Sequence, residues 1–434
     1  MAKHEVEAEE ERERAILVGL ILPEVSHQEA KDTLDELELL ADTAGAVVLG
    51  RVTQARKNVD QAYFIGQGKA AELALQVKEQ KVDVVIFDDD LSPAQLRNLE
   101  EEIGCKIVDR SRLILDIFAG RAKTREAQTQ VELAQLNYML PRLTRQWTHL
   151  SRQQAGHGGT TGGIGTRGPG ETQLEVDRRA LRLRIRTLSK ALDRIARQRA
   201  VGRKQRSSTY RTALVGYTNA GKSTLMHALS GADVLVEDRL FATLDSTTRR
   251  VYLGYNREVL LTDTVGFIRK LPHHLVASFR STLEETVDSD LLLHVVDASH
   301  PACEEQIGSV FETLESLGIA ENPMLTVFNK VDILQDPGRR AYYESEYPGS
   351  VWISALTGEG LDDLRNAIYE RIEGDRTVLT LRIPQSEGKL LSEIYDCGEI
   401  LSTRYESNDV ILEVSLSRHH AHRLLPEGRY RVSA

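Results

Sequence analysis

The centre of the chain carries the sequence Gly216-Tyr217-Thr218-Asn219-Ala220-Gly221-Lys222-Ser223. It fits the pattern G-x-x-x-x-G-K-[ST], the phosphate-binding P-loop. The apolar run Thr212–Val215 before it predicts a buried strand, and Leu225–Leu229 after it begins a helical period. Between a strand and a helix, the backbone N–H groups of such a turn cradle phosphate oxygens. We therefore expect an α/β fold that binds a nucleoside phosphate, with Lys222 on the β- and γ-phosphates and Ser223 on Mg²⁺.

A second stretch supplies the carboxylate that such a site needs. The strand candidate Val259–Thr262 leads into Asp263-Thr264-Val265-Gly266. Asp263 is expected to hold the Mg²⁺ shell through water, and Gly266 is expected to offer its N–H to the γ-phosphate. The order of these motifs along the chain is the one that a P-loop hydrolase requires.

A third stretch, Phe241-Ala242-Thr243-Leu244-Asp245, lies between the first two and precedes a strand candidate at Arg249–Leu253. Thr243 is expected to ligate Mg²⁺ when the γ-phosphate is present, so that this loop senses the nucleotide state. The catalytic roles are assigned to Lys222, Thr243 and Gly266.

The base is recognised farther along the chain. The strand candidate Leu325–Phe328 ends in Asn329-Lys330-Val331-Asp332. The Asp332 carboxylate can accept two hydrogen bonds from guanine N1–H and the 2-amino group, a pair that adenine lacks. Ser354-Ala355-Leu356 can supply a backbone donor to guanine O6. These motifs together predict GTP rather than ATP.

Position 267 predicts the rate of hydrolysis. Many GTPases carry Gln directly after D-x-x-G, where it orients the attacking water. The residue here is Phe267, whose apolar ring cannot orient water by hydrogen bonding. We predict slow intrinsic hydrolysis that a partner accelerates by ordering the switch loops, and hydrolysis by the purified protein at about 1 s⁻¹ or faster would contradict this.

Composition indicates a soluble protein of roughly three domains. Of the 434 residues, 41% are hydrophobic and 28% are charged. The longest apolar runs, such as Ala15–Leu22, are strand-sized and far short of a membrane span. Cys105, Cys303 and Cys397 are widely spaced and odd in number, which argues against a disulfide framework or a zinc site. We expect a cytoplasmic protein in a reducing compartment.

The charge is unevenly distributed. The net charge is −10, yet Arg121 to Arg211 contains 20 Lys/Arg and 6 Asp/Glu, so this segment carries +14 and the remainder −24. A strongly basic segment inside an acidic protein is typical of nucleic-acid binding. The alternative interpretation is a solvated helix face.

Residues 15–110 alternate strand and helix signals, which predicts a small parallel α/β domain after a flexible tail at residues 1–14. Gly66-Gln67-Gly68-Lys69 is either a phosphate-binding turn or an ordinary turn, and the second fits better because the motif stands alone. The expected strands are Ala15–Leu22, Ala46–Val52, Val82–Phe87 and Cys105–Val108, and the expected helices are Glu29–Leu40, Ala70–Val77 and one from Pro93.

Residues 111–208 predict a long antiparallel helical hairpin, packed like a coiled coil. One arm carries an apolar stripe at Val131, Ala134 and Tyr138. The other arm carries apolar residues at Leu174, Leu181, Ile185, Leu188, Leu192 and Ile195. Four arginines lie off this stripe and are expected to face outward: Arg178, Arg182, Arg186 and Arg197.

The expected tip of the hairpin is residues 156–170, of which eight are Gly. No Asp or Glu occurs between Glu132 and Glu171. Such a tip suits folded RNA, because Arg neutralises phosphate, Gly permits close approach and aromatic rings stack on bases. A disordered linker is the alternative. The basic and aromatic residues concerned are Arg142, Arg145, Trp147, His149, Arg152, His157 and Arg167.

Gly163-Ile164-Gly165-Thr166-Arg167-Gly168 spells G-x-G-x-x-G, but no strand precedes it, so we reject a dinucleotide site there.

Residues 209–375 are expected to form the GTPase domain, and residues 376–434 a small α+β domain without evident chemistry. The expected elements of the last domain are strand Val378–Ile383, helix Leu390–Ile394, the hairpin Glu399–Tyr405 with Val410–Val414, and helix His419–Leu425.

These motifs and their order resemble the HflX family of ribosome-associated GTPases, within the Obg-HflX superfamily. The specific marks are Gly168-Pro169-Gly170-Glu171-Thr172, Asp177-Arg178-Arg179, residues 241–248 and Asp263-Thr264-Val265-Gly266-Phe267. Two positions depart from the usual pattern. Ser246 stands where the family usually has Pro, and Leu356 stands where many GTPases have Lys.

The resemblance implies a partner. Members bind the large ribosomal subunit and its rRNA through the N-terminal and hairpin domains, and separate stalled or idle ribosomes under stress. It also implies a cytoplasmic protein, with peripheral membrane association in some members. We further expect a monomer when the protein is free. Two alternatives stay open: an RNA-remodelling NTPase with a second, ATP-binding site in the N-terminal domain, and a signalling GTPase with a protein effector, against which the +14 segment argues.

Overall fold

The computed structural model describes residues 12–143, 169–204, 210–231, 240–241, 243–254, 257–270, 286–287, 289–319, 322–334, 336–374, 376–417, 421, 424–425 and 430. The chain forms two compact units. The first contains Met1–Arg194, Asp238–Asp245 and Arg269–Arg280, and the second contains Ile195–Glu237, Ser246–Ile268 and Ser281–Ala434. Among the described residues, no helix is both long and apolar enough to cross a membrane.

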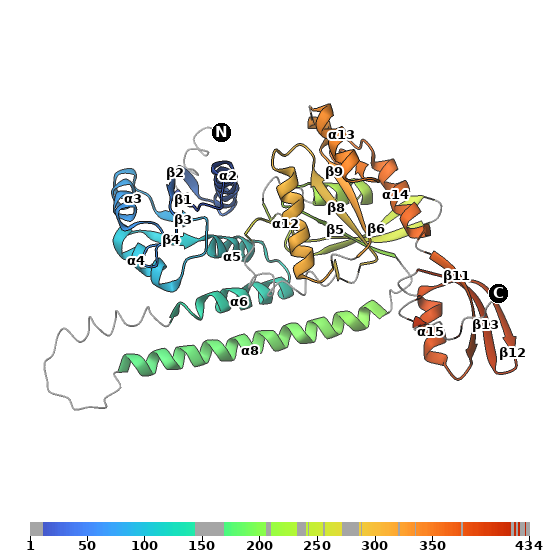
Figure 1. Cartoon of the computed structure of the whole chain (residues 1–434). Helices are drawn as coiled ribbons and strands as arrows, with labels where there is room; N and C mark the ends of the chain where they lie inside the picture. Colours follow the sequence, from blue (N-terminus) through green and yellow to red (C-terminus); the bar gives the residue numbers. More distant parts are fainter. Residues whose placement is uncertain are drawn as a thin grey trace, which may run out of the picture. The chain divides into compact units, whose positions relative to one another are not determined.

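The first unit is built on a parallel four-stranded sheet in the order β2-β1-β3-β4 (Figure 1). Its strands and helices confirm the expected alternation. They are β1 (Arg14–Ile21), α2 (His27–Thr43), β2 (Val47–Ala55), α3 (Gln67–Gln80), β3 (Val84–Phe87), α4 (Pro93–Ile103) and β4 (Lys106–Asp109). Because Arg14 already belongs to β1, the first sheet begins inside the stretch expected to be a tail.

The period of two along β1 divides its side chains between two helical layers. Ile16 and Val18 belong to the buried cluster that includes Leu73 of α3 and Leu99 of α4. Gly19 lies on the other side, where a Cβ would press on Leu34 of α2. The sheet is therefore covered on both faces, which leaves its carboxyl edge as the polar end of the core.

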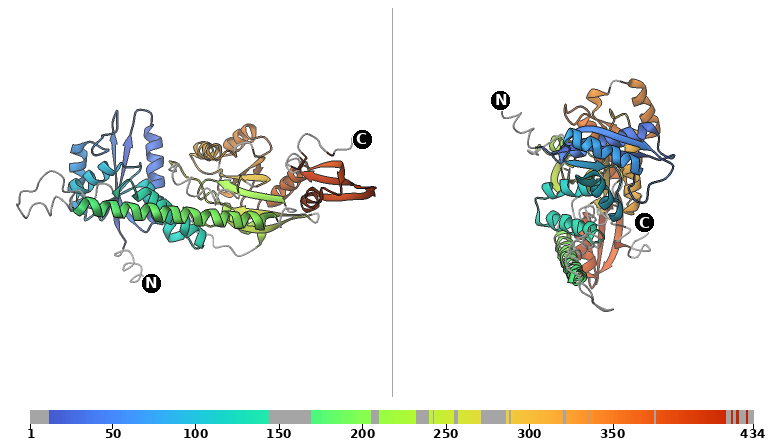
Figure 2. Two further views of the ribbon diagram at one scale, coloured as in Figure 1. Left: turned by 90° about the horizontal axis from the view of Figure 1, so that it is seen from below. Right: turned by 90° about the vertical axis from the view of Figure 1, so that its left-hand side faces the viewer.

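The described helices that follow the sheet are α5 (Arg110–Arg121), α6 (Arg125–Met139) and α8 (Pro169–Lys204). Arg184 of α8 donates to both Glu132 carboxylate oxygens of α6, at 2.7 and 2.8 Å. Figure 2 shows α8 as one unbroken helix. Pro169 and Gly170 were expected to end the tip loop, but they are the first two residues of α8. Pro is tolerated there because the first N–H groups of a helix have no intrahelical acceptor.

The predicted apolar stripe of α8 is largely confirmed. Leu188 is buried, and Leu181, Ile185, Leu192 and Ile195 are half-buried. The tip between α6 and α8, including Trp147, His149 and residues 156–168, lies outside the described residues. The domain boundaries at 110/111, 208/209 and 375/376 remain predictions.

The second unit contains a six-stranded sheet in the order β10-β9-β8-β5-β7-β6, in which β6 alone runs antiparallel to its neighbour. The strands are β5 (Tyr210–Gly216), β6 (Thr247–Gly254), β7 (Arg257–Asp263), β8 (Leu291–Asp297), β9 (Met324–Asn329) and β10 (Val351–Trp352). The helices are α9 (Lys222–Ser230), α12 (Cys303–Ser316), α13 (Pro337–Glu346) and α14 (Leu361–Gly374), with a 3₁₀ turn η1 (Val331–Ile333).

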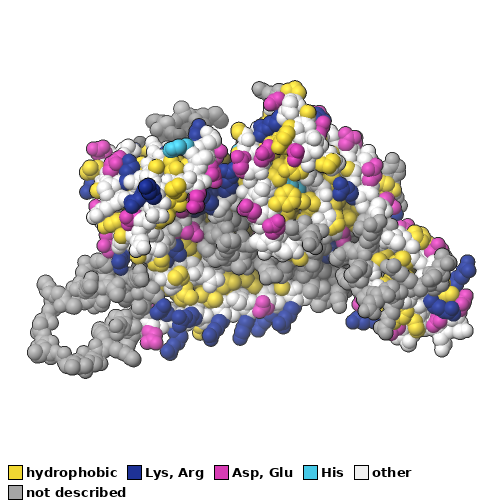
Figure 3. All heavy atoms as spheres, viewed as in Figure 1, with side chains coloured by type: hydrophobic (Ala, Val, Ile, Leu, Met, Phe, Trp, Pro, Cys, Tyr) yellow, Lys and Arg dark blue, Asp and Glu magenta, His cyan; other side chains and the backbone are white. Residues whose placement is uncertain are grey.

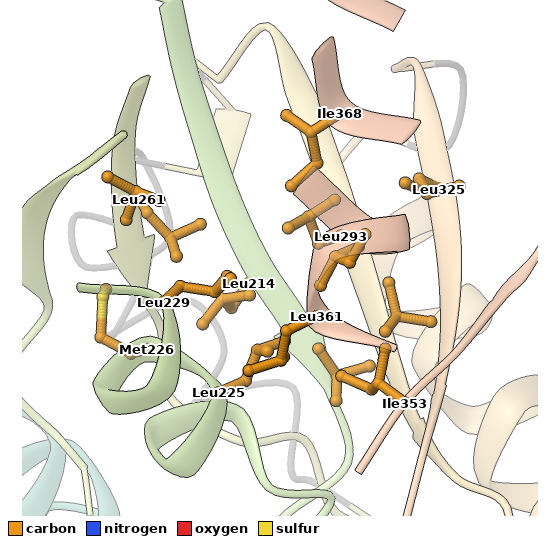
Figure 4. Packing of buried hydrophobic residues seen from close by; sticks show 14 of the residues in the cluster. Leu214, Leu225, Met226, Leu229, Leu261, Leu293, Leu325, Ile353, Leu361 and Ile368 are labelled. Atoms are coloured by element: carbon orange, nitrogen blue, oxygen red, sulfur yellow. The ribbon is translucent and has the colours of Figure 1, made fainter. Parts of the chain in front are cut away.

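Both faces of this sheet are packed with apolar side chains. Figure 4 shows Leu214 and Leu293 of the sheet against Leu225 of α9 and Leu361 of α14. On the opposite face, Phe328 packs among residues of α12 and α13. A parallel sheet buried on both faces presents its polar groups at the carboxyl ends of the strands, where the P-loop lies.

The C-terminal segment folds as expected, where it is described. It forms an antiparallel sheet in the order β11-β13-β12, with one helix. The elements are β11 (Arg376–Pro384), α15 (Gly388–Cys397), β12 (Glu399–Glu406) and β13 (Asp409–Ser417). Most of the last expected helix, 419–425, lies outside the described residues.

Candidate nucleotide-binding site

The P-loop joins β5 to α9 and depends on two glycines. Gly216 has φ 152° and Gly221 has φ 91°, in the region that residues with a Cβ rarely adopt. A Cβ at Gly216 would collide with the backbone oxygen of Val295, and one at Gly221 with the amide nitrogen of Asn329. The neighbouring strands β8 and β9 therefore require glycine at both positions.

We predict that Gly216→Ala lowers the free energy of unfolding by about 3 kcal/mol or more, because the obstacle is backbone on a central strand. Gly308→Ala is the matched control. Gly308 lies inside α12 with open space around it, so this variant should be more stable by about 0.5–1 kcal/mol. Thermal unfolding of the full chain measures both. Equal midpoints for Gly216→Ala and wild type would contradict the steric argument.

Lys222 lies at the first position of α9 and is buried. Its ammonium group donates to the carbonyl oxygens of Gly216 at 3.1 Å and Tyr217 at 2.7 Å. Burial lowers the Lys222 pKa to about 8, although the Asp263 carboxylate partly opposes this shift. Burial and the nearby Lys222 charge also lower the pKa of His294 on β8 to about 4, so this histidine is neutral at pH 7.

This pKa predicts proton uptake on nucleotide binding. At pH 8 about half of the Lys222 side chains are neutral in the free protein, and phosphate oxygens would restore the charge. Binding should take up about half a proton at pH 8 and about a tenth at pH 7, so affinity falls as the pH rises above about 8. Calorimetry in buffers of different ionisation enthalpy measures this, and equal uptake at both pH values would contradict it.

Ser223 and Asp263 form the oxygen-rich part of the site. The Ser223 hydroxyl donates to Asp263 Oδ2 at 2.7 Å. Asp263 is the last residue of β7, and its side chain is buried. The next residue, Thr264, donates through its hydroxyl to the Leu214 carbonyl at 2.6 Å. The structure thus brings together the two motifs that the sequence assigned to Mg²⁺.

The backbone after Gly266 pairs with the P-loop, a feature that no sequence motif indicates. Thr218 N–H donates to the Phe267 carbonyl at 2.8 Å, and Phe267 N–H donates to the Gly216 carbonyl at 3.1 Å. A Cβ at Gly266 would come within 2.8 Å of Thr218 Cα and 3.0 Å of Lys222 Nζ. Close backbone approach is therefore the reason for glycine at position 266. The Phe267 ring itself is buried.

Asn329 connects the P-loop to the other end of the site. Its amide nitrogen donates to the Ala220 carbonyl at 2.8 Å, and its amide oxygen accepts from Ala355 N–H at 2.9 Å. Val331 N–H donates to the Ile353 carbonyl at 3.2 Å, which joins the two loops assigned to the base. Because its side chain is buried with both ends bonded, Asn329 acts here as a bridge between loops.

The side chains assigned to the base differ in exposure. Asp332 is exposed on η1, whereas Ser354 is buried and accepts from Thr357 N–H at 3.1 Å. Leu356 is 80% exposed. Lys330 has φ 66° and pairs with Asp297 Oδ2 at 2.8 Å. Sequence reasoning missed Asp297, which follows the apolar run of β8 and could have been noticed as a carboxylate at a strand end.

The stretch Phe241–Asp245 belongs to the first unit, whereas the site residues described above belong to the second. Phe241 packs edge-on against Phe118 of α5, with ring centroids 4.7 Å apart. Asp245 accepts from the backbone N–H groups of Lys123 at 3.1 Å and Thr124 at 3.2 Å, and from the Thr124 hydroxyl. Leu244 is buried, Thr243 is half-buried and Ala242 lies outside the described residues. The Mg²⁺ role of Thr243 remains a prediction.

Comparison with known proteins identifies four sequence families along the chain. Residues 31–119 match a family described as GTP-binding GTPase N-terminal, and residues 121–206 match GTP-binding GTPase Middle Region. Residues 211–330 match 50S ribosome-binding GTPase, and residues 344–427 match the HflX C-terminal domain.

Curated relatives cover nearly the full length. The GTPase HflX of Caldanaerobacter subterraneus is 45% identical over 94% of this chain and 92% of its own. The GTPase HflX of Escherichia coli is 48% identical over 89% of both chains. Among solved structures, a GTP-binding protein from Sulfolobus solfataricus in complex with GDP is 25% identical, covers 82% of this chain and 98% of its own, and has a TM-score of 0.42. From its full-length relatives, this chain belongs to the HflX family and is a GTPase.

Proposed function

We propose that this GTPase is a nucleotide-gated factor that binds the large ribosomal subunit, dissociates or rescues stalled or idle ribosomes, and hydrolyses GTP faster on the ribosome. The observation that carries the proposal is a row of exposed basic side chains on α8, visible in Figure 3. They follow one another at intervals of three or four residues, which places them on one face of the helix. The row consists of Arg179, Arg182, Arg186, Lys190, Arg194 and Arg197.

The length and charge of this row suit an RNA backbone. From Arg179 to Arg197 the helix rises about 27 Å. Cations along such a face can each neutralise a phosphate, which gives strong and salt-dependent affinity. The match of residues 211–330 to a family of 50S ribosome-binding GTPases supports ribosomal RNA as the partner.

In this proposal, Lys222 binds the β- and γ-phosphates, Gly266 N–H binds the γ-phosphate and Asp332 binds guanine. Ser223 and Asp263 would hold Mg²⁺, with Thr243 as a further ligand. The residues fit this ion, because a hydroxyl and a carboxylate 2.7 Å apart are the oxygen donors that it prefers. When bound, Mg²⁺ neutralises developing charge on the phosphates.

Slow hydrolysis by the free protein follows from Phe267. Its ring is buried and apolar, so it offers no hydrogen bond to an attacking water. A ribosomal surface that orders the switch loops would supply the missing stimulation. The measurement is single-turnover GTP hydrolysis with and without purified large subunits, and equal rates would contradict the stimulation.

Ribosome binding is tested by co-sedimentation of the full chain with large subunits in a GTP analogue, GDP or no nucleotide. The Arg182→Ala, Arg186→Ala, Lys190→Ala triple variant should weaken binding and reduce the slope of log K against log salt by about 2–3. The control removes the same charge elsewhere, at the exposed Lys31, Lys57 and Lys78. If wild-type affinity for the large subunit is the same in every nucleotide state and at every salt concentration, the proposal is wrong. Deleting residues 156–168, which leaves α8 whole, tests the loop.

The alternative function places a second, ATP-binding site in the N-terminal domain. Its motif is Gly66-Gln67-Gly68-Lys69, which forms the start of α3. Lys69 is paired with Glu72 Oε1 at 2.7 Å, so a bound phosphate would have to replace this carboxylate. ATP binding that survives Lys222→Ala would support the alternative. A cytoplasmic location, a monomeric free state and membrane association remain predictions.

A further inference from the structure

The carboxyl edge of the first sheet carries a group of acidic residues. Asp88 and Asp89 follow β3, and Asp109 ends β4. This edge is where ligands of parallel α/β sheets usually bind. Here two cations of the chain itself, Arg110 and Lys270, lie against the carboxylates of Asp88 and Asp89. Lys270 comes four residues after Gly266, and both cations belong to the first unit.

Arg110 contacts both the acidic residues and the segment after Gly266. Its side chain is only 1% exposed, and one guanidinium nitrogen donates to Asp88 Oδ1 at 2.7 Å. The other nitrogen pairs with Glu36 and donates to the backbone carbonyl of Arg269 at 3.1 Å. A buried arginine with two carboxylate partners is a rigid donor, so the carbonyl of residue 269 is held at a defined place.

Lys270 holds the same segment by charge. Its ammonium group lies 2.6 Å from Asp88 Oδ2 and 2.6 Å from Asp89 Oδ1. The residue has φ 52°, a left-handed conformation that a residue with a Cβ adopts only where surrounding contacts compensate. Although burial opposes it, the two carboxylates raise the Lys270 pKa, so the ammonium stays charged.

The other end of the segment is tied to the nucleotide site. The backbone of Phe267 pairs with Gly216 and Thr218 of the P-loop. Lys270 is three residues farther along, a reach of about 10 Å at most. A short covalent segment therefore joins the P-loop pairing at Phe267 to the ion pairs of Lys270.

Asp109, the residue next to Arg110, contacts residues at the end of α6 and just after it. The fully buried Asp109 accepts from the Tyr138 hydroxyl at 2.8 Å and from Arg142 at 2.9 Å. Arg142 also lies over the Tyr138 ring, 3.4 Å from its centroid, and donates to the Leu91 carbonyl at 2.9 Å. Expected to neutralise phosphate, Arg142 instead anchors the base of the tip loop. Asp109 and Arg110 thus contact the base of the tip loop and the segment after Gly266, respectively.

We infer that Asp88, Asp89 and Arg110 form a binding site for the segment after Gly266, and that Lys270 is the positioning residue that links the nucleotide state to the base of the tip loop. The hairpin's RNA partner rests on the proposed function. The link itself does not, because every contact that carries it lies within this chain.

The first test uses the free full-length protein. Amide hydrogen exchange at residues 88–91 and 109–112 is compared between GDP and a GTP analogue. We expect rates in wild type to differ by about fivefold or more, and Lys270→Ala to remove the difference while GTP affinity stays within about twofold. Lys270→Arg should retain it, as should Lys31→Ala, which removes an exposed lysine of α2. Equal exchange in both nucleotides, or a difference that survives Lys270→Ala, would overturn the inference.

The second test separates this inference from the proposed function. Large-subunit affinity is measured with each nucleotide for the same variants. We expect Lys270→Ala to reduce the ratio of the affinities measured with the GTP analogue and with GDP by about fivefold or more. The variant should still bind the large subunit. If wild type shows nucleotide-dependent exchange but no ribosome binding, the proposed function fails and the internal link stands. If the ratio of affinities is unchanged in Lys270→Ala, the link fails and ribosome binding stands.

Discussion

Lys222→Ala is expected to lower the rate of GTP hydrolysis by about 100-fold or more. The ammonium group is the buried cation of the P-loop, and removing one preorganised donor to developing charge typically costs two to three orders of magnitude. GTP affinity should fall as well, because a charge-assisted hydrogen bond contributes about 1.5–3 kcal/mol. Single-turnover hydrolysis and nucleotide titration measure the two effects.

The stability of this variant provides the control. Since burial lowers the Lys222 pKa to about 8, the ammonium group is costly in the nucleotide-free protein. Lys222→Ala should therefore unfold no more easily than wild type without nucleotide, and lose the stabilisation that GTP gives wild type. Lys190→Ala, an exposed change on α8, should hydrolyse GTP at the wild-type rate. Wild-type hydrolysis by Lys222→Ala would show that the P-loop assignment is wrong.

Asp332→Asn is expected to weaken GTP binding by about 100-fold, or about 3 kcal/mol. The carboxylate accepts two hydrogen bonds from guanine in the proposed site, and the amide of Asn presents one donor where an acceptor is needed. Xanthine carries a carbonyl in place of the 2-amino group, so the variant should bind xanthosine triphosphate better than GTP. Competition against a fluorescent nucleotide measures both affinities.

Asp362→Asn is the matched control for this change. Asp362 lies in the first turn of α14, its side chain is 92% exposed, and it is not one of the residues assigned to the base. Its variant should bind GTP as wild type does. If Asp332→Asn discriminates between guanine and xanthine nucleotides as wild type does, the base is recognised by other groups.

Local sequence was sufficient to predict the phosphate end of the site. The run Thr212–Val215 is apolar because β5 is buried on both faces, and glycines frame the turn because strands β8 and β9 leave no room for a Cβ. The Ser223–Asp263 pair was also predictable, since parallel strands bring their carboxyl ends to one edge. Periodicity alone likewise predicted the alternating elements of the first sheet.

The long-range pairings were not predictable in this way. Asn329 belongs to the motif assigned to the base, and that motif does not indicate that both ends of its amide bond to backbone of other loops, one of them 109 residues away. Arg142 reads as an RNA contact, yet it is held by Asp109. Each side chain has several chemically acceptable partners, and sequence pattern does not rank them by distance.

Residue types and their short-range order thus determined the reaction class of this chain: a strand, a glycine turn and a helix for phosphate, a carboxylate for the metal shell and another for guanine. The tertiary structure decided which charges meet. Lys270 donates to Asp88, which is 182 positions away in the sequence, and Asp245 accepts from Thr124, which is 121 positions away. The physical reason is that hydrogen bonds and ion pairs act over a few ångströms in space, whereas sequence patterns record only positions along the chain.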